Sequence, residues 1–256
     1  MNDLNLMLHC GGKTVTPDEL ERVVTPEATS TWQPISHIEL LNKVKETLTA
    51  TGLRVTSEAH GLARDGMRYF GMMQIANGEE AAGGYGFVTG LRNSHDQSFP
   101  SGLVVGSGVF VCDNLSFSGE IRLSRKHTLH IRRDLPQLIQ RAVGKLADYR
   151  QRQVLRYERY RTTEIVDRQA NDLIIQALDA RIVPLTRIPE VLTEWRSPRH
   201  PEFSREGKTG WRLFNAFTEA LKGGDPTLMM KRTMALHGLM DSTCGVLKEV
   251  VATTVA

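Results

Sequence analysis

Residues 90–133 decide the fold of this chain and read GLRNSHDQSFPSGLVVGSGVFVCDNLSFSGEIRLSRKHTLHIRR. The stretch opens on a polar cluster at residues 92–96, passes through the apolar run 103–112 and closes on the basic segment 122–133. Polar groups of this variety, so close to a glycine-rich apolar run, indicate a functional surface in addition to a scaffold. We expect a strand with polar and basic residues around its ends.

A series of strands is predicted around this stretch. Residues 53–59 and 67–76 have a period of two and are joined through the turn Asp65–Gly66. Residues 85–92 and 103–114 are the third and fourth predicted strands, and residues 118–123 add a short fifth. Because the four main strands follow one another without helices between them, we expect an antiparallel meander.

Helices are predicted before and after the strands. Ser36 and Glu39 have the spacing of a capping box at the start of the first helix, and Gly52 suits its end. Asp134 can cap a second helix, with Pro136 in its first turn, which continues through an arginine-rich stretch to about Tyr160. Further helical patterns cover residues 165–178, 210–221 and 226–240, the last with Asp225 and Pro226 as N-cap and first residue.

The order of these elements predicts an α+β fold. It is an antiparallel meander of four to five strands with the long basic helix packed across it, followed by a helical C-terminal region. Residues 1–33 are interpreted as an arm that is disordered or docked on a neighbouring subunit, residues 34–182 as the α+β core, and residues 183–256 as the helical region. Gly102, Gly106 and Gly108 share one face of the fourth strand, and we interpret them as the place where the long helix approaches closely.

Composition places the chain among ordinary globular proteins. It has 256 residues, a net charge of +3 and no apolar run of the roughly 18 residues that a membrane span needs. The first residues lack a signal-peptide pattern. The three cysteines, at positions 10, 112 and 244, form neither a disulfide framework nor a zinc spacing. We therefore expect a cytoplasmic protein in a reducing compartment.

Positive charge is concentrated in one part of the chain. Residues 122–168 contain 13 Lys or Arg and 5 Asp or Glu, so this segment carries +8. Because the whole chain carries +3, the remainder carries −5. Such asymmetry favours an acidic partner, nucleic acid before others. A solvated helical face is the alternative explanation.

Several polar residues could instead carry out catalysis. Ser94, His95 and Asp96 have the residue types of a catalytic triad, but consecutive residues do not converge as a triad requires. A polar loop bonded to its own backbone is the alternative. Cys112 could be a thiol nucleophile, although a cysteine at the end of an apolar strand is usually a small buried hydrophobe.

Two kinds of ligand site were also considered. A metal site would draw on histidines and aspartates within residues 95–130, but the alternation around residues 123–129 is typical of extended chain, whereas the two imidazoles there need a helix. Its candidate ligands are His95, Asp96, Asp113, His127 and His130. The run GYGFVTG at residues 84–90 enters a strand and opens no helix, so it lacks the device of a dinucleotide loop, and no Walker pattern is present.

Four motifs carry a resemblance to a known family. RNSHDQSF (residues 92–99), VFVCDNLSFSGEI (109–121), RKHT (125–128) and WRLFNAFTE (211–219) resemble the signature of the phage- and plasmid-borne family called domain of unknown function 932, over roughly residues 34–222. The resemblance implies a role in DNA replication, recombination or defence. The element order is also similar to the core of eukaryotic-type single-strand annealing proteins. That similarity implies a ring that holds single-stranded DNA in an outer basic groove and pairs complementary strands without ATP.

We therefore predict a protein that binds single-stranded DNA and acts in annealing or recombination as a homo-oligomeric ring, with no cofactor and no membrane contact. The alternative is a metal-dependent enzyme that acts on nucleic acid or nucleotides through His95, Asp96 and Asp113. Cations spaced along strand ends and a helical ridge can follow a phosphate backbone, and strand aromatics such as Phe70 can stack on bases. The residues predicted to bind nucleic acid are Arg92, Asn93, His95, Arg122, Arg125, Lys126, Arg132, Arg133, Arg152 and Arg156.

Overall fold

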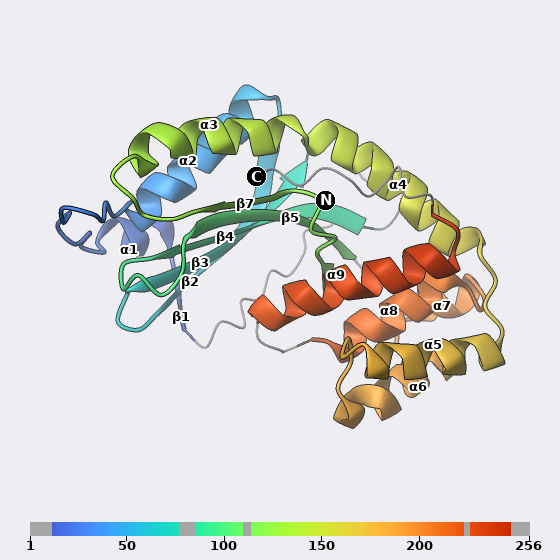
Figure 1. Ribbon diagram of the computed structural model, residues 1–256. Helices are drawn as coiled ribbons and strands as arrows, with labels where there is room; N and C mark the ends of the chain where they lie inside the picture. The colour runs from blue at the N-terminus through green and yellow to red at the C-terminus, as the bar shows by residue number, and fades with distance from the viewer. Residues whose placement is uncertain (1–11, 77–84, 110–113, 223–225, 247–256) are drawn as a thin grey trace.

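The computed structural model describes residues 12–76, 85–109, 114–222 and 226–246, and it confirms the predicted α+β class. One antiparallel sheet has two helices, α2 and α3, over one of its faces (Figure 1). A long helix, α4, leads from there to a group of helices that contains α5–α8, with α9 returning toward the sheet (Figure 1). None of the helices in the described ranges is both long and apolar enough to cross a membrane.

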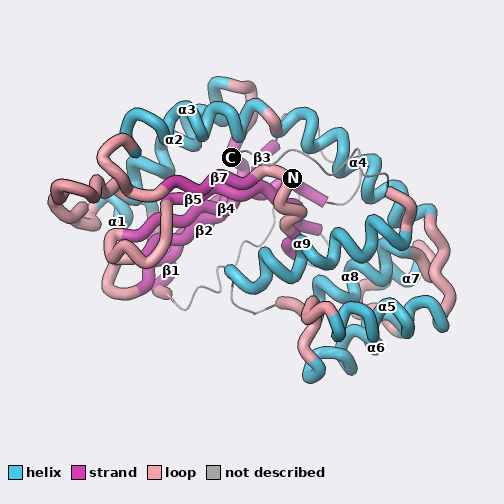
Figure 2. The backbone as a smooth tube through the Cα atoms, viewed as in Figure 1, coloured by secondary structure: helices cyan, strands magenta, loops and turns pink. Residues whose placement is uncertain are grey.

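Four long strands form the predicted meander. They are β2 (Arg54–Ala63), β3 (Arg68–Ala76), β4 (Tyr85–Ser94) and β5 (Ser101–Val109), and each pairs antiparallel with the next. Within the described ranges, three short strands complete a seven-stranded sheet: β1 (Lys13–Val15), β6 (Asn114–Ser116) and β7 (Arg122–Arg125). Figure 2 shows these strands as one layer beside the helices. The prediction of four to five strands was therefore too low.

The far edge of β5 explains why the later strand boundaries differ from the prediction. β7 pairs with the beginning of β5 and β6 pairs with its end, so two short segments share one edge. The predicted fourth strand ends at Val109, before residues 110–113, which lie outside the described ranges. The fifth strand, predicted over residues 118–123, is β7 and begins later, at Arg122. The reason is that Gly119 has a φ of 78° and turns the chain before it.

The N-terminal segment is docked on its own chain in its described part. β1 pairs with residues 60–62 of β2, and Thr16 then caps α1 (Pro17–Glu21) in a capping box with Glu19. Leu20 of α1 is fully buried in the main core. The interpretation of this segment as a disordered arm, or one docked on a neighbouring subunit, is corrected for residues 13–21. Backbone pairing and burial within the same chain hold them.

Helices α2 (His37–Ala50) and α3 (Ile131–Gly144) begin differently from the prediction. Ser36 is the N-cap of α2, as predicted, but its side chain makes no capping bond, and the Glu39 carboxylate binds Arg132 of α3, at 3.0 Å. Helix α3 begins three residues before the predicted cap, Asp134, so Pro136 lies inside it and removes one hydrogen bond of the helix.

The long basic helix is only partly packed across the sheet. After a brief irregularity at Lys145, α4 (Leu146–Thr162) continues the path of α3, as predicted through Tyr160. Tyr149 in its first turn packs on Phe87 with ring centroids 5.8 Å apart, and the Tyr157 hydroxyl further along bonds to Ser107 of β5. Beyond these contacts the helix extends toward the C-terminal helical group (Figure 1).

The helical group is built around α8 (Gly210–Ala220), in which every residue is buried. Around it lie α5 (Asp167–Asp179), the short 3₁₀ turn η1 (Leu185–Arg187), α6 (Ile188–Arg196), α7 (Pro201–Arg205) and α9 (Pro226–Thr243). The predicted helices at residues 210–221 and 226–240 are confirmed, and Asp225 lies outside the described residues. The domain boundary predicted after residue 182 falls between α5 and α6, but these two helices pack together. One hydrophobic core spans the sheet and the helices.

The two faces of the sheet differ in what covers them. Tyr69, Leu91 and Leu103 point to the face under α2 and α3 and belong to the main core. Their sequence neighbours point to the opposite face, where one cross-strand row contains Phe70, Arg92, Gly102 and Ser124 and the adjacent row contains Arg122. We call this second face, defined by Phe70, Arg92, Phe99, Gly102, Arg122 and Ser124, the Arg92 face.

The glycines of β5 make room on the second face and not under the long helix. A Cβ on Gly106 would lie 2.4 Å from the carbonyl oxygen of Ser116 and 2.5 Å from the Phe117 ring. A Cβ on Gly102 would lie 3.2 Å from Nε of Arg92. The prediction that these glycines admit the basic helix was therefore wrong, because that helix packs on the other face. Gly102 instead lets the Arg92 side chain lie across β5.

Candidate functional site

The RNSHD motif contributes to a buried hydrogen-bond network beneath α2. The Asn93 amide donates to the carbonyl oxygen of Ile35 at 2.7 Å and to Nδ1 of His37 at 3.0 Å. Its side-chain oxygen accepts from Ser101 at 2.5 Å and from Nε2 of His127 at 2.8 Å. Asn93 is fully buried and is already bonded on both sides. The prediction that it binds nucleic acid is corrected, because its side chain holds the segment before α2 to the sheet.

His95 belongs to the same buried network. Its Nε2 donates to the carbonyl oxygen of Ile35 at 2.9 Å, and its ring stacks on that of His37 with centroids 3.9 Å apart. Burial lowers the pKa of His95, and it lowers the pKa values of both His37 and His127 to about 4. These imidazoles are therefore neutral at pH 7. A buried neutral imidazole cannot neutralise a phosphate, so His95 is also removed from the predicted binding residues.

Ser94, His95 and Asp96, which have the residue types of a triad, bond to different partners. The Ser94 hydroxyl donates to the carbonyl oxygen of Phe99 at 2.6 Å, and the Asp96 carboxylate pairs with Nε of Arg68 at 2.7 Å. Neither bonds to the His95 ring in the described structure. Ser94 and Asp96 therefore fix the loop between β4 and β5, as the polar-loop alternative expected.

The described residues do not provide a set of ligands for a metal site. Among them, no group of three or more His, Cys, Asp and Glu side chains is arranged to hold a metal ion. His130 lies at the exposed start of α3, whereas His95 and His127 are buried. Cys112 and Asp113 lie outside the described ranges. The metal-dependent enzyme that would use His95, Asp96 and Asp113 stays a hypothesis.

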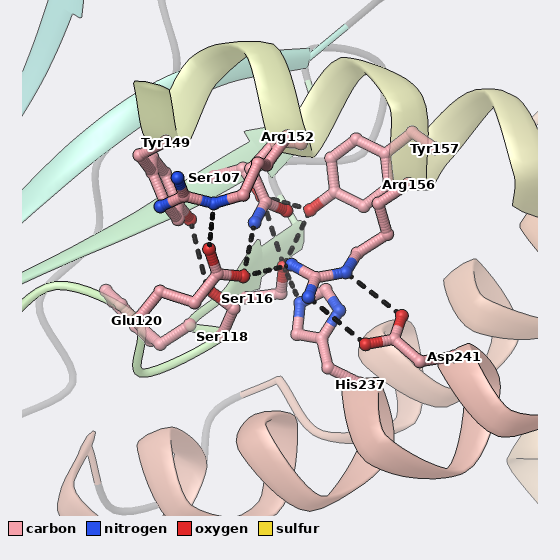
Figure 3. Close-up of polar contacts among 12 residues, drawn as sticks. Ser107, Ser116, Ser118, Glu120, Tyr149, Arg152, Arg156, Tyr157, His237 and Asp241 are labelled. Atoms are coloured by element: carbon pink, nitrogen blue, oxygen red, sulfur yellow. Dashed lines mark hydrogen bonds and ion pairs between the residues drawn. The ribbon is translucent and has the colours of Figure 1, made fainter. Parts of the chain in front are cut away.

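A second buried network joins α4 to α9 and to Glu120 of the VFVCDNLSFSGEI motif (Figure 3). Arg156 is 1% exposed and donates to Glu120 at 2.6 Å and to both carboxylate oxygens of Asp241, at 3.0 and 3.1 Å. Arg152 and Gln153 also donate to Glu120, at 3.1 and 3.0 Å. Burial acts to lower the pKa of Arg156, but the two carboxylates outweigh burial and raise it.

This network corrects the predicted helical ridge of cations. Arg156 points inward from α4 toward Asp241, and Arg152 turns toward Glu120 (Figure 3). Of the three arginines that define this ridge, Arg152, Arg156 and Arg159, only Arg159 is exposed. The sequence spacing was consistent with a common helix face, but the ridge prediction failed because the carboxylates that neutralise two of its cations come from residues 120 and 241.

The basic residues around the start of α3 mostly pair with carboxylates. Arg125 contacts Asp134 at 2.7 Å, Arg133 contacts the same carboxylate at 2.8 Å, and Arg132 binds Glu39. These pairs are part-exposed, so each is worth little energy and can exchange for a phosphate. Lys126 is exposed and forms no ion pair with the described residues.

Arg92 and Arg122 are arranged differently from the other predicted cations. They lie in adjacent rows of the Arg92 face, and neither forms an ion pair in the part of the chain that the structure describes. Burial lowers the pKa of Arg92, and the nearby Arg122 charge lowers it further. The two guanidinium groups therefore repel each other on a sheet face where no described carboxylate neutralises them.

Two aromatic rings stand beside these cations. The guanidinium carbon of Arg92 lies 5.5 Å from the centre of the Phe99 ring, and Phe99 packs on Phe70 with centroids 5.4 Å apart. Both rings are half-buried. Sequence reasoning considered Phe70 for stacking but missed Phe99, because the loop that returns it to Phe70 is a tertiary feature. The RNSHDQSF motif, which ends on Phe99, was the available signal.

The motifs that carry the family resemblance lie at positions that hold the fold together. RNSHD and RKHT meet beneath α2, Glu120 enters the Arg156 network, and WRLFNAFTE is the buried helix α8. The profile of the family described as Domain of unknown function (DUF932) matches residues 27–240. The chain belongs to this family. No curated protein and no solved structure matches it. The DUF932 motifs thus lie in the two buried networks and in the central helix. Arg92 and Phe99, the two ends of the RNSHDQSF motif, lie on the Arg92 face instead.

Proposed function

We propose that this protein binds single-stranded DNA on the Arg92 face and pairs complementary strands in annealing or recombination, as an oligomer. The observation that supports the proposal is the unneutralised pair Arg92 and Arg122. Holding two like charges near each other, one of them half-buried, costs free energy, and a polyanion that neutralises both recovers it. Guanidinium groups bind phosphates well, because their paired N–H donors match two phosphate oxygens.

The character of the face favours a nucleic-acid strand among polyanions. A flat sheet surface with cations and aromatic side chains can contact both the phosphates and the bases of an extended strand. Lys126 is exposed and comes directly after β7, so it can extend the cationic path at the edge of the sheet. Because phosphate contacts carry no sequence information, binding is expected to tolerate mixed sequences.

Replacing Arg92 and Arg122 together by Gln is expected to weaken single-stranded DNA binding and its salt dependence. If each arginine contacts one phosphate, the log–log salt slope becomes shallower by about 1.4, since each contact on a single strand contributes roughly 0.7. Fluorescence anisotropy titrations over a range of salt concentrations measure both quantities. Strand pairing, followed by the quenching of labels on complementary strands, should slow in parallel.

The matched control replaces two exposed arginines outside the sheet, Arg159 on α4 and Arg168 on α5, by Gln. This variant has the same net charge as the test variant, and it is expected to keep the wild-type slope. An unchanged slope in a folded Arg92→Gln, Arg122→Gln protein would exclude the Arg92 face. Absence of DNA binding by the wild type at low salt would refute the proposed function.

The edge of β2 supports the oligomeric part of the proposal. β1 pairs only with residues 60–62, so residues 54–59 have no strand partner on their outer side within the described ranges. Such an edge presents backbone donors and acceptors that a second subunit can satisfy. Light scattering at micromolar concentration is expected to give a mass well above that of a dimer. A monodisperse monomer under these conditions would contradict the ring.

A further inference from the structure

The loop that carries Phe99 is held rigidly by its own polar residues. The Ser94 hydroxyl donates to the carbonyl oxygen of Phe99 at 2.6 Å, and the Phe99 amide donates back to the same hydroxyl at 3.3 Å. Asp96 accepts from the Ser98 amide at 3.1 Å and is tied to Arg68 on β3. The polar residues of the RNSHDQSF motif thus fix the aromatic ring at its end beside Arg92.

A glycine on the neighbouring strand leaves room for the Arg92 side chain beside this ring. Gly102 stands directly across from Arg92, and its lack of a Cβ lets the Arg92 side chain lie flat over β5. The guanidinium then sits over Phe99, and Phe70 supports the ring from the adjacent strand. One cationic group and one aromatic group are therefore in contact on a partly exposed sheet face.

We infer that the Arg92–Phe99 pair is the platform on which one unpaired base of the bound strand rests. Aromatic rings and guanidinium planes both stack on nucleobases, and every base offers a flat face for this contact. In a duplex that face is covered by the neighbouring base pairs. The platform therefore selects strands with unpaired bases and tolerates any sequence, while Arg122, which is exposed, contacts a neighbouring phosphate.

This inference rests on the proposed function. A comparison of two ligands of equal charge tests the inference separately from the function. One is a deoxythymidine oligonucleotide, and the other is an abasic oligonucleotide with the same number of phosphates. Anisotropy titrations of the full chain should give an affinity for the thymidine strand at least roughly fivefold higher, the lower end of what stacking one base contributes. Phe99→Leu, which keeps an apolar contact with Phe70, should bring that ratio close to one.

Two further variants complete the test. Arg92→Lys retains the charge but has no plane to stack, so the preference for the thymidine strand should fall. Trp32→Leu removes another half-buried aromatic ring, one that contacts His127, and should leave the ratio at its wild-type value. Equal affinities of the wild type for both ligands would overturn the platform and leave phosphate binding intact. Failure of the wild type to bind either ligand would overturn the proposed function and the platform together.

Discussion

Arg156→Met is expected to destabilise the protein by about 3–5 kcal/mol, the range found when one partner of a buried ion pair is removed. Methionine fills much of the same volume but leaves the buried carboxylate of Asp241 without its two guanidinium bonds. The Tyr160 hydroxyl, at 2.6 Å, is then the partner that remains for Asp241 in this network. Glu120 loses less, because Arg152 and Gln153 still donate to it. Urea unfolding followed by circular dichroism measures the loss.

The origin of this effect can be separated from lost packing by a second substitution. Burial raises the pKa of Asp241, and Arg156 opposes that rise, so the carboxylate depends on the guanidinium to stay ionised. Asp241→Asn in the Arg156→Met background is therefore expected to restore part of the stability. Arg159→Met, on an exposed position of the same helix, should change stability by less than about 0.5 kcal/mol. A similar small effect at Arg156 would show that the network contributes nothing to the folded state.

Acidification is expected to produce the second large loss of stability, in the window from pH 6.5 down to about 4. Burial lowers the pKa values of His37 and His127 to about 4, and it also lowers those of His95 and His237. A histidine whose pKa is depressed in the folded state stabilises the fold fully above pH 6.5. As the pH falls below 6.5, the histidines of the unfolded chain bind protons, whereas the buried histidines of the folded chain do not. This stabilisation is therefore lost.

The expected slope is about 1.4 kcal/mol per pH unit for each histidine that ionises only after unfolding. Asp241 acts with the opposite sign, because burial raises its pKa and the folded state takes up its proton more readily. Urea unfolding between about pH 7 and pH 5 measures the balance. His37→Gln should make the slope shallower, and His130→Gln, which replaces an exposed imidazole, should not. Stability that stays constant across this window would mean that the buried imidazoles are accessible to protons.

The arrangement of elements could be predicted because their signals are local. Alternating residues and the turn at Asp65–Gly66 predicted the meander, and Gly52, at φ 76°, ends α2 as expected. The short strands β1, β6 and β7 were missed or misplaced because three or four residues carry too little periodicity, and they form only where β2 and β5 offer an edge. The motifs also identified the family correctly, since a family profile reads the same residues.

The sequence by itself determined which residue types were present at the site, but only the tertiary structure decided which of them face the surface. Asn93 and Arg92 are consecutive, yet the alternation of a strand sends Asn93 under α2 and Arg92 to the opposite face. Arg156 and Arg159 lie on one helix, yet Asp241, 85 residues further along the chain, neutralises the first and leaves the second exposed. A buried ion pair makes a charge unavailable to a ligand, and the partner in such a pair comes from a distant segment whose approach no local pattern records.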